Sequence, residues 1–69
     1  MKTILTQKYS HIVEHRNRFY EVRCYGDNTA YELVTLRQGM KDALYFKKYN
    51  HNKKLLTKIL EFLNLPLPL

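Results

Sequence analysis

The sequence predicts a small α+β domain: a three-stranded antiparallel β-meander followed by one broken or two short C-terminal helices packed on one sheet face. Two observations predict this class. Tyrosine, valine, threonine and isoleucine are concentrated before Leu36, whereas lysine and leucine dominate after it. The former favour strands and the latter favour helices. The 69 residues suit one domain, which we expect to span residues 1–64, with an apolar, proline-containing tail at residues 65–69.

The strand half is divided by turn residues into segments in which apolar and polar side chains alternate. Asn17 tolerates a positive φ, and glycine followed by Asp and Asn is a strong turn signal. Two short connections imply an antiparallel meander. The expected segments are strand Tyr9–His15 (with an extension back to Ile4 as an alternative), turn His15–Arg18, strand Phe19–Tyr25, turn Gly26–Thr29 and strand Ala30–Leu36.

The single cysteine lies within the second expected strand. Alternation places Tyr20, Val22 and Cys24 on one face and Arg23 on the other. We therefore interpret Cys24 as a small buried hydrophobe and not as a nucleophile. An unpaired cysteine is typical of a reducing compartment, and no stretch approaches the roughly 20 apolar residues of a membrane span. We expect a cytoplasmic protein that does not enter a membrane.

The periodicity changes after Leu36 and indicates helices. Thr35 could cap a first helix that begins near Arg37 and runs to about Tyr49, although Gly39 disfavours its first turn by about 1 kcal/mol relative to alanine. Asn52 is a good N-cap for a second helix from Lys53 to about Asn64. One continuous bent helix over residues 37–64 is the alternative. The apolar residues expected on one arc of the second helix are Leu55, Leu56, Ile59, Leu60, Phe62 and Leu63.

The sequence contains no pattern typical of an enzyme or a metal site. It has no nucleophile with an adjacent base, no phosphate-binding glycine loop and no zinc-ligand spacing. His11, Glu14, His15, Arg16 and Arg23 could gather at one end of the sheet, as in small ribonuclease toxins, but geometry and not residue type identifies acid–base partners. We expect a non-enzymatic protein without a cofactor or metal.

Positive charge is concentrated in the C-terminal half. The net charge is +6, and residues 37–69 hold seven lysines and arginines but only two acidic residues. Such asymmetry favours a polyanionic partner, although a solubilising helix surface explains it equally well. The leading hypothesis is DNA or RNA binding through a basic helical surface, thickened by Lys47 and Lys53. The proposed contacts are Arg16, Arg18, Arg37, Lys41, Lys48, Lys54, Lys58 and Tyr45.

The competing hypothesis is a small phage- or plasmid-type regulatory protein that binds and modulates a host protein. The apolar arc of the last helix and the tail suggest a docking surface. A chain this short is marginally stable alone, so we also expect a homodimer. The proposed protein-interaction residues are Leu56, Leu60, Leu63, Leu65 and Leu67.

Overall fold

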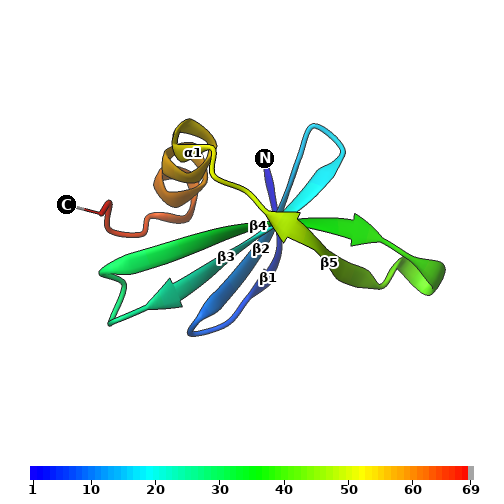
Figure 1. The fold of residues 1–69 in the computed structure, drawn as a ribbon, viewed down its shortest axis with the longest axis horizontal. Helices are drawn as coiled ribbons and strands as arrows, with labels where there is room; N and C mark the ends of the chain where they lie inside the picture. Colours follow the sequence, from blue (N-terminus) through cyan, green and yellow to red (C-terminus); the bar gives the residue numbers. More distant parts are fainter. Residues whose placement is uncertain (69) are drawn as a thin grey trace.

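Five strands form one antiparallel sheet in chain order, and a single helix follows them (Figure 1). The computed structural model describes residues 1–68. A short 3-10 turn (Met40–Asp42) joins the last two strands. The elements are β1 (Lys2–Thr6), β2 (Ser10–His15), β3 (Arg18–Tyr25), β4 (Ala30–Gln38), β5 (Leu44–Tyr49) and α1 (Lys53–Leu63).

The predicted three-stranded meander with one broken or two short helices is wrong at the N-terminus. Lys2–Thr6 is a strand of its own, not an extension of β2, and it pairs antiparallel with β2. The chain reverses between them, where the Gln7 N–H donates a hydrogen bond to the Ser10 carbonyl over 2.8 Å. The order Lys-Thr-Ile-Leu-Thr does not alternate apolar and polar residues, and all five are exposed. The pairing with β2 also shifts register between Thr3 and Leu5.

The prediction is also wrong between Arg37 and Tyr49, where no helix forms. This segment completes β4, turns, and returns as β5 along β4. Gly39 is extended (φ −109°, ψ −154°), and the Tyr45 ring lies against it. The aromatic residues of Leu44–Tyr49 favour a strand, and pairing with β4 satisfies the β5 backbone. That tertiary contact outweighs the weak helical periodicity.

The remaining predicted elements are present. β2, β3 and the first part of β4 match the expected strands, and α1 matches the second expected helix. The β2–β3 hairpin turns through Arg16 and Asn17, whose φ angles are +53° and +63°. Positive φ at both central residues is typical of the tightest hairpin turns, because their twist matches that of the strands.

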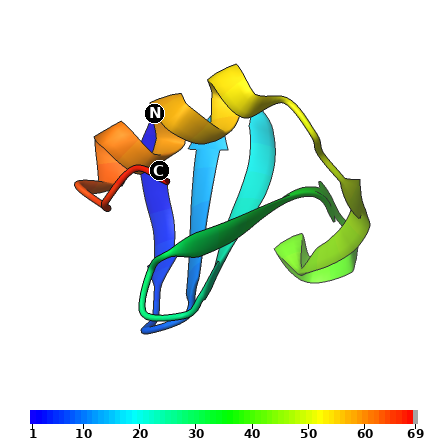
Figure 2. The ribbon, with the colours of Figure 1, turned by 60° about the vertical axis from the view of Figure 1, so that its left-hand side comes forward.

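The core lies between α1 and one face of the sheet (Figure 2). Ile59 and Leu60 of α1 are fully buried, together with Val13 and Val22 of the sheet. Each such side chain contributes roughly 1.5–3 kcal/mol on burial. Cys24 is 3% exposed on the same face, as alternation predicted.

Two asparagines set where α1 begins. The Asn50 N–H donates to the Leu33 carbonyl and its side-chain amide donates to Thr35 Oγ1, which fastens the linker to β4. The Asn52 N–H donates to Asn50 Oδ1, and Asn52 Oδ1 accepts from the Leu55 N–H over 3.1 Å. Asn52 is thus the N-cap, as predicted, and α1 starts at a defined point above β4.

The tail folds back on its own domain at its first residues. Asn64 is left-handed (φ +59°), and the Leu65 N–H reaches the Leu60 carbonyl over 2.9 Å, which closes the helix end. Leu65 packs on the core. Tyr31 Oη donates to the Pro66 carbonyl over 2.6 Å. Leu69, the last residue of the predicted tail, lies outside the described residues.

The second face of the sheet has no helix over it within residues 1–68. We call it the open face. Val34 and Leu36 are nevertheless buried there, because Val34 lies between Glu21 and Tyr49, and Leu36 between Phe19 and Phe46. The residues of the open face used below are Ser10, Phe19, Glu21, Arg23, Tyr25, Glu32, Val34, Leu36, Phe46 and Tyr49.

In the described part of the chain, no helix is both long and apolar enough to cross a membrane. The helix α1 has only 11 residues.

The cap at Asn52 predicts a specific loss of stability. Asn52→Ala removes the acceptor for the Leu55 N–H and should lower the free energy of unfolding by about 1 kcal/mol. Asn52→Ser retains a capping oxygen and should behave nearly as wild type. Chemical denaturation followed by circular dichroism measures both, and equal stability of the two variants would contradict the role of the cap.

The position of Cys24 predicts slow thiol chemistry. Burial raises the pKa of the Cys24 thiol, so both access and the thiolate fraction are low in the native state. A thiol reagent should label Cys24 slowly in native protein and rapidly in denaturant. Cys24→Ala should cost on the order of 1 kcal/mol through the cavity it leaves. Fast native labelling would place the side chain outside the core.

Candidate functional site

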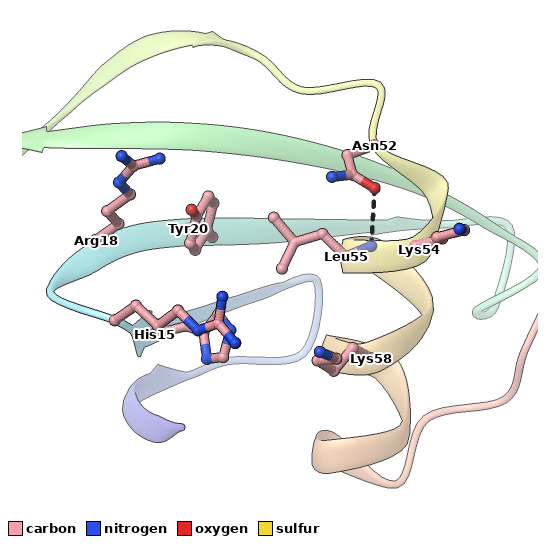
Figure 3. Close-up of a pocket in the computed structure, with 8 residues that line it drawn as sticks. His15, Arg18, Tyr20, Asn52, Lys54, Leu55 and Lys58 are labelled. Carbon is pink, nitrogen blue, oxygen red and sulfur yellow. Dashed lines mark hydrogen bonds between the residues drawn. The ribbon is translucent and has the colours of Figure 1, made fainter.

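A cleft opens between the β2–β3 turn and the N-terminal half of α1. Figure 3 shows His15 and Arg18 on the strand side, Lys58 on the helix, and Tyr20 and Leu55 between them. The cleft has a volume of about 440 Å³. We call it the hairpin cleft; its lining residues are His15, Arg16, Arg18, Tyr20, Asn52, Lys54, Leu55 and Lys58.

A second cleft of about 410 Å³ adjoins the first and shares Arg18 and Tyr20 with it. It lies where the β4–β5 pairing shifts register between Thr35 and Leu36. The extra residue in β5 is Lys47, a β-bulge that bends the strand. We call this the bulge cleft; its lining residues are Asn17, Arg18, Phe19, Tyr20, Thr35, Leu36, Arg37, Gln38, Lys47, Lys48 and Asn50.

The two clefts form one basic surface. Together they are lined by seven lysines and arginines, and within residues 1–68 no aspartate or glutamate lines either of them. The seven are Arg16, Arg18, Arg37, Lys47, Lys48, Lys54 and Lys58. Partial burial, the Arg16 guanidinium and the Lys58 ammonium lower the pKa of His15, in that order of effect. A positive field therefore fills the hairpin cleft, and it favours an anion there.

The structure gathers six of the eight predicted nucleic-acid contacts and separates two. Arg16, Arg18, Lys54 and Lys58 line the hairpin cleft, and Arg37 and Lys48 line the bulge cleft. The predicted helical surface is nevertheless wrong for Arg37, Lys41 and Lys48, which lie on β4, the 3-10 turn and β5. Lys41 and Tyr45 line neither cleft.

Sequence reasoning missed His15, Tyr20 and Asn52 as lining residues. The sequence indicated a possible acid–base role for His15, a core position for Tyr20 and a helix N-cap at Asn52. The hairpin turn and the helix start were both recognisable locally. Their proximity across roughly 35 residues of chain was not, because it follows from how α1 packs on the sheet.

The predicted protein-interaction residues lie mostly in the chain's own core. Leu60 is fully buried, and Leu56, Leu63 and Leu65 pack against the buried cluster. Leu67 is 50% exposed. Phe62, expected on the apolar arc, is 44% exposed.

The structure does not assemble the scattered acid–base residues. His11 is buried opposite Val22, whereas His15 and Arg16 line the hairpin cleft. Glu14 and Arg23 belong to the other face of the sheet. Among residues 1–68, no three His, Cys, Asp or Glu side chains are grouped to hold a metal ion.

A third cleft, of about 500 Å³, lies at the other end of β4, beyond the last residue of β5. Three tyrosines line it: Tyr25, Tyr31 and Tyr49. We call it the tyrosine cleft. It also contains the Glu32 carboxylate and the Lys53 ammonium, so its charge is mixed, unlike that of the basic surface.

Comparisons with protein-family models, with curated proteins and with solved structures find no match to this chain. Any functional conclusion therefore depends on the geometry and charge of the molecule itself.

The environment of His15 predicts a pH dependence with a definite sign. Because its pKa is lowered in the folded state, the unfolded chain binds the proton more readily, and stability should fall as pH drops below the ordinary histidine range. A bound polyanion should raise the pKa of His15, so binding should strengthen over the same fall in pH. NMR titration of the His15 ring, with and without a polyanion, measures both shifts. An unchanged His15 pKa at saturation would contradict anion binding in the hairpin cleft.

Proposed function

We propose that this protein binds nucleic acid through the basic surface of the hairpin and bulge clefts. The observation that carries the proposal is their lining of seven lysines and arginines without a carboxylate within residues 1–68. Cations grouped on a protein surface neutralise phosphates and release condensed counterions, which supplies most non-specific affinity for nucleic acid.

The arrangement of the surface supports a backbone contact as its main interaction. Arg18 belongs to both clefts, so a phosphate chain could pass from one cleft to the other without crossing an acidic region. Lysine and arginine contacts to phosphate position a protein on nucleic acid but do not read sequence. Asn17, in the bulge cleft, supplies the kind of amide that binds base edges.

A protein partner, including a second copy of the chain, is the second candidate. The open face favours it, because Phe46, Tyr49 and Tyr25 are 48%, 47% and 50% exposed there. In this case the protein would act by binding and modulating another protein, or would form a homodimer. Sedimentation at micromolar concentration should then show a mass greater than that of one chain.

The basic surface predicts a charge-specific loss of nucleic-acid binding. Arg18→Gln with Lys58→Gln removes two cations from the clefts and should reduce the slope of log K against log salt by about 1.8 on duplex DNA, at about 0.9 per phosphate contact. Affinity should fall for all sequences alike. Fluorescence anisotropy at several salt concentrations gives the slope.

The matched control is Lys8→Gln with Lys41→Gln. It makes the same change in net charge at two exposed residues that line neither cleft. Surface changes of this kind alter stability by less than about 0.5 kcal/mol each. Equal loss in both double variants would show that only net charge matters. The absence of salt-sensitive binding to any nucleic acid would contradict the proposed function.

A further inference from the structure

We infer that the nucleic acid is single-stranded, with its phosphates on the basic surface and its bases against the aromatic side chains of the open face. This inference rests on the proposed function and specifies its ligand. Proteins that bind single strands combine a cationic path for the backbone with aromatic rings on which unpaired bases stack. Both parts are present in this molecule, and they adjoin.

The open face presents exposed aromatic rings. Phe46 and Tyr49 are each about half exposed, and their ring centroids lie 5.0 Å apart in an edge-to-face arrangement. Their partners on the adjacent strand, Val34 and Leu36, are buried, so the two rings flank an apolar part of the face. The Arg23 guanidinium lies 5.8 Å from the Phe46 ring centroid, and the exposed parts of the two rings remain available to a flat base.

The β-bulge brings charge and aromatic rings together. Phe46 and Tyr49 are three residues apart, so in a regular strand they would point to opposite faces. The register shift instead pairs Phe46 with Leu36 and Tyr49 with Val34, which places both rings on the open face. The two residues between them are Lys47 and Lys48, both in the bulge cleft.

The bulge cleft itself spans the boundary between the two surfaces. Phe19 and Leu36 of the open face line it together with Arg37, Lys47 and Lys48. We expect a backbone held by these cations to place its bases over the adjoining open face, where Phe19 and Phe46 lie on either side of Leu36. A base of the same strand could continue past Tyr49 into the tyrosine cleft, because Tyr49 lies on the open face and also lines that cleft.

The carboxylates of the open face make it unfavourable for phosphates but not for neutral bases. Glu21 accepts hydrogen bonds from Ser10 Oγ at 2.6 Å and Arg23 Nε at 3.0 Å. Glu32 lies 3.7 Å from Arg23 Nη1 and accepts from Tyr25 Oη at 3.0 Å. Two glutamates against one arginine leave a negative excess, which repels phosphates but not neutral bases. A duplex, which presents phosphates on its outside, fits this face poorly.

The experiment compares short single strands of DNA and RNA with the duplex of the same sequence. Phe46→Leu and Tyr49→Leu remove the stacking rings but keep an apolar side chain over Val34 and Leu36. Each should weaken single-strand binding about fivefold or more, since base stacking on one aromatic side chain is worth roughly 1–3 kcal/mol. Duplex binding should stay unchanged. Anisotropy titrations at one fixed low salt concentration measure both.

Phe62→Leu on α1 and Tyr9→Leu in the β1–β2 turn are the matched controls. Their side chains are 44% and 55% exposed, and neither lines the basic surface. Thermal unfolding checks that each variant is folded. Should Phe46→Leu fail to fold, Tyr49→Leu and Tyr25→Leu provide the same comparison.

The outcomes separate this inference from the proposed function. Salt-sensitive binding that is equal for single strands and duplex, and unaffected by Phe46→Leu and Tyr49→Leu, would overturn the inference and leave the proposed function standing. A wild-type dimer that Phe46→Leu dissociates would assign the open face to a second copy and also overturn it. If the wild-type protein binds neither single strands nor duplex, both the inference and the proposed function are overturned.

Discussion

The packing of one helix against one face of the sheet is the constraint on which the rest of the structure depends. Ile59 and Leu60 are fully buried against that face, and burying apolar surface is the main favourable term in folding so small a chain. Asn50 and Asn52 fix where the helix starts. From that position, Lys54 and Lys58 stand opposite the β2–β3 turn, and the hairpin cleft is the space between them.

Because α1 packs on one face only, the open face is covered by side chains of the sheet itself. With one helix in the described chain, the sheet shields Val34 and Leu36 with side chains from neighbouring strands. The Arg23 guanidinium lies 5.8 Å from the Phe46 ring centroid and also binds Glu21. The hydrogen bond from Arg23 to Glu21 raises the pKa of Arg23. This face is thus ordered by its own contacts and still presents aromatic surface outward.

Positive and negative side chains are concentrated on different parts of the surface. The cations of the two clefts gather where the β2–β3 turn, the start of α1 and the bulged end of β5 meet. Grouping like charges opposes folding through their mutual repulsion. The pKa of His15 is lowered first by desolvation and then by the Arg16 and Lys58 charges. An anionic partner would relieve the repulsion. Strand alternation places Glu14, Glu21 and Glu32 on the open face, and Arg23 pairs with Glu21 and Glu32 there.

Much of the fold was predictable because its signals are local. The hairpin turn at Arg16 and Asn17, the core face of β3 and the start of α1 at Asn52 all follow from a few neighbouring residues. The segment Leu44–Tyr49 was not predictable in this way. Its sequence does not alternate apolar and polar residues, because a bulge interrupts the strand. Pairing with β4 therefore decides its structure together with its aromatic residues.

The sequence by itself determined that the chain is basic and which face of the central strands is the core face, since the first depends on residue type and the second on the period of a strand. Only the tertiary structure decided which cations meet. Arg18 joins Lys58 because α1 packs over β3, and Lys48 joins Arg37 because a bulge sets the β4–β5 register. The first pair links segments 40 residues apart and the second spans the β4–β5 turn. Their placement comes from burial and backbone pairing, which no local pattern encodes.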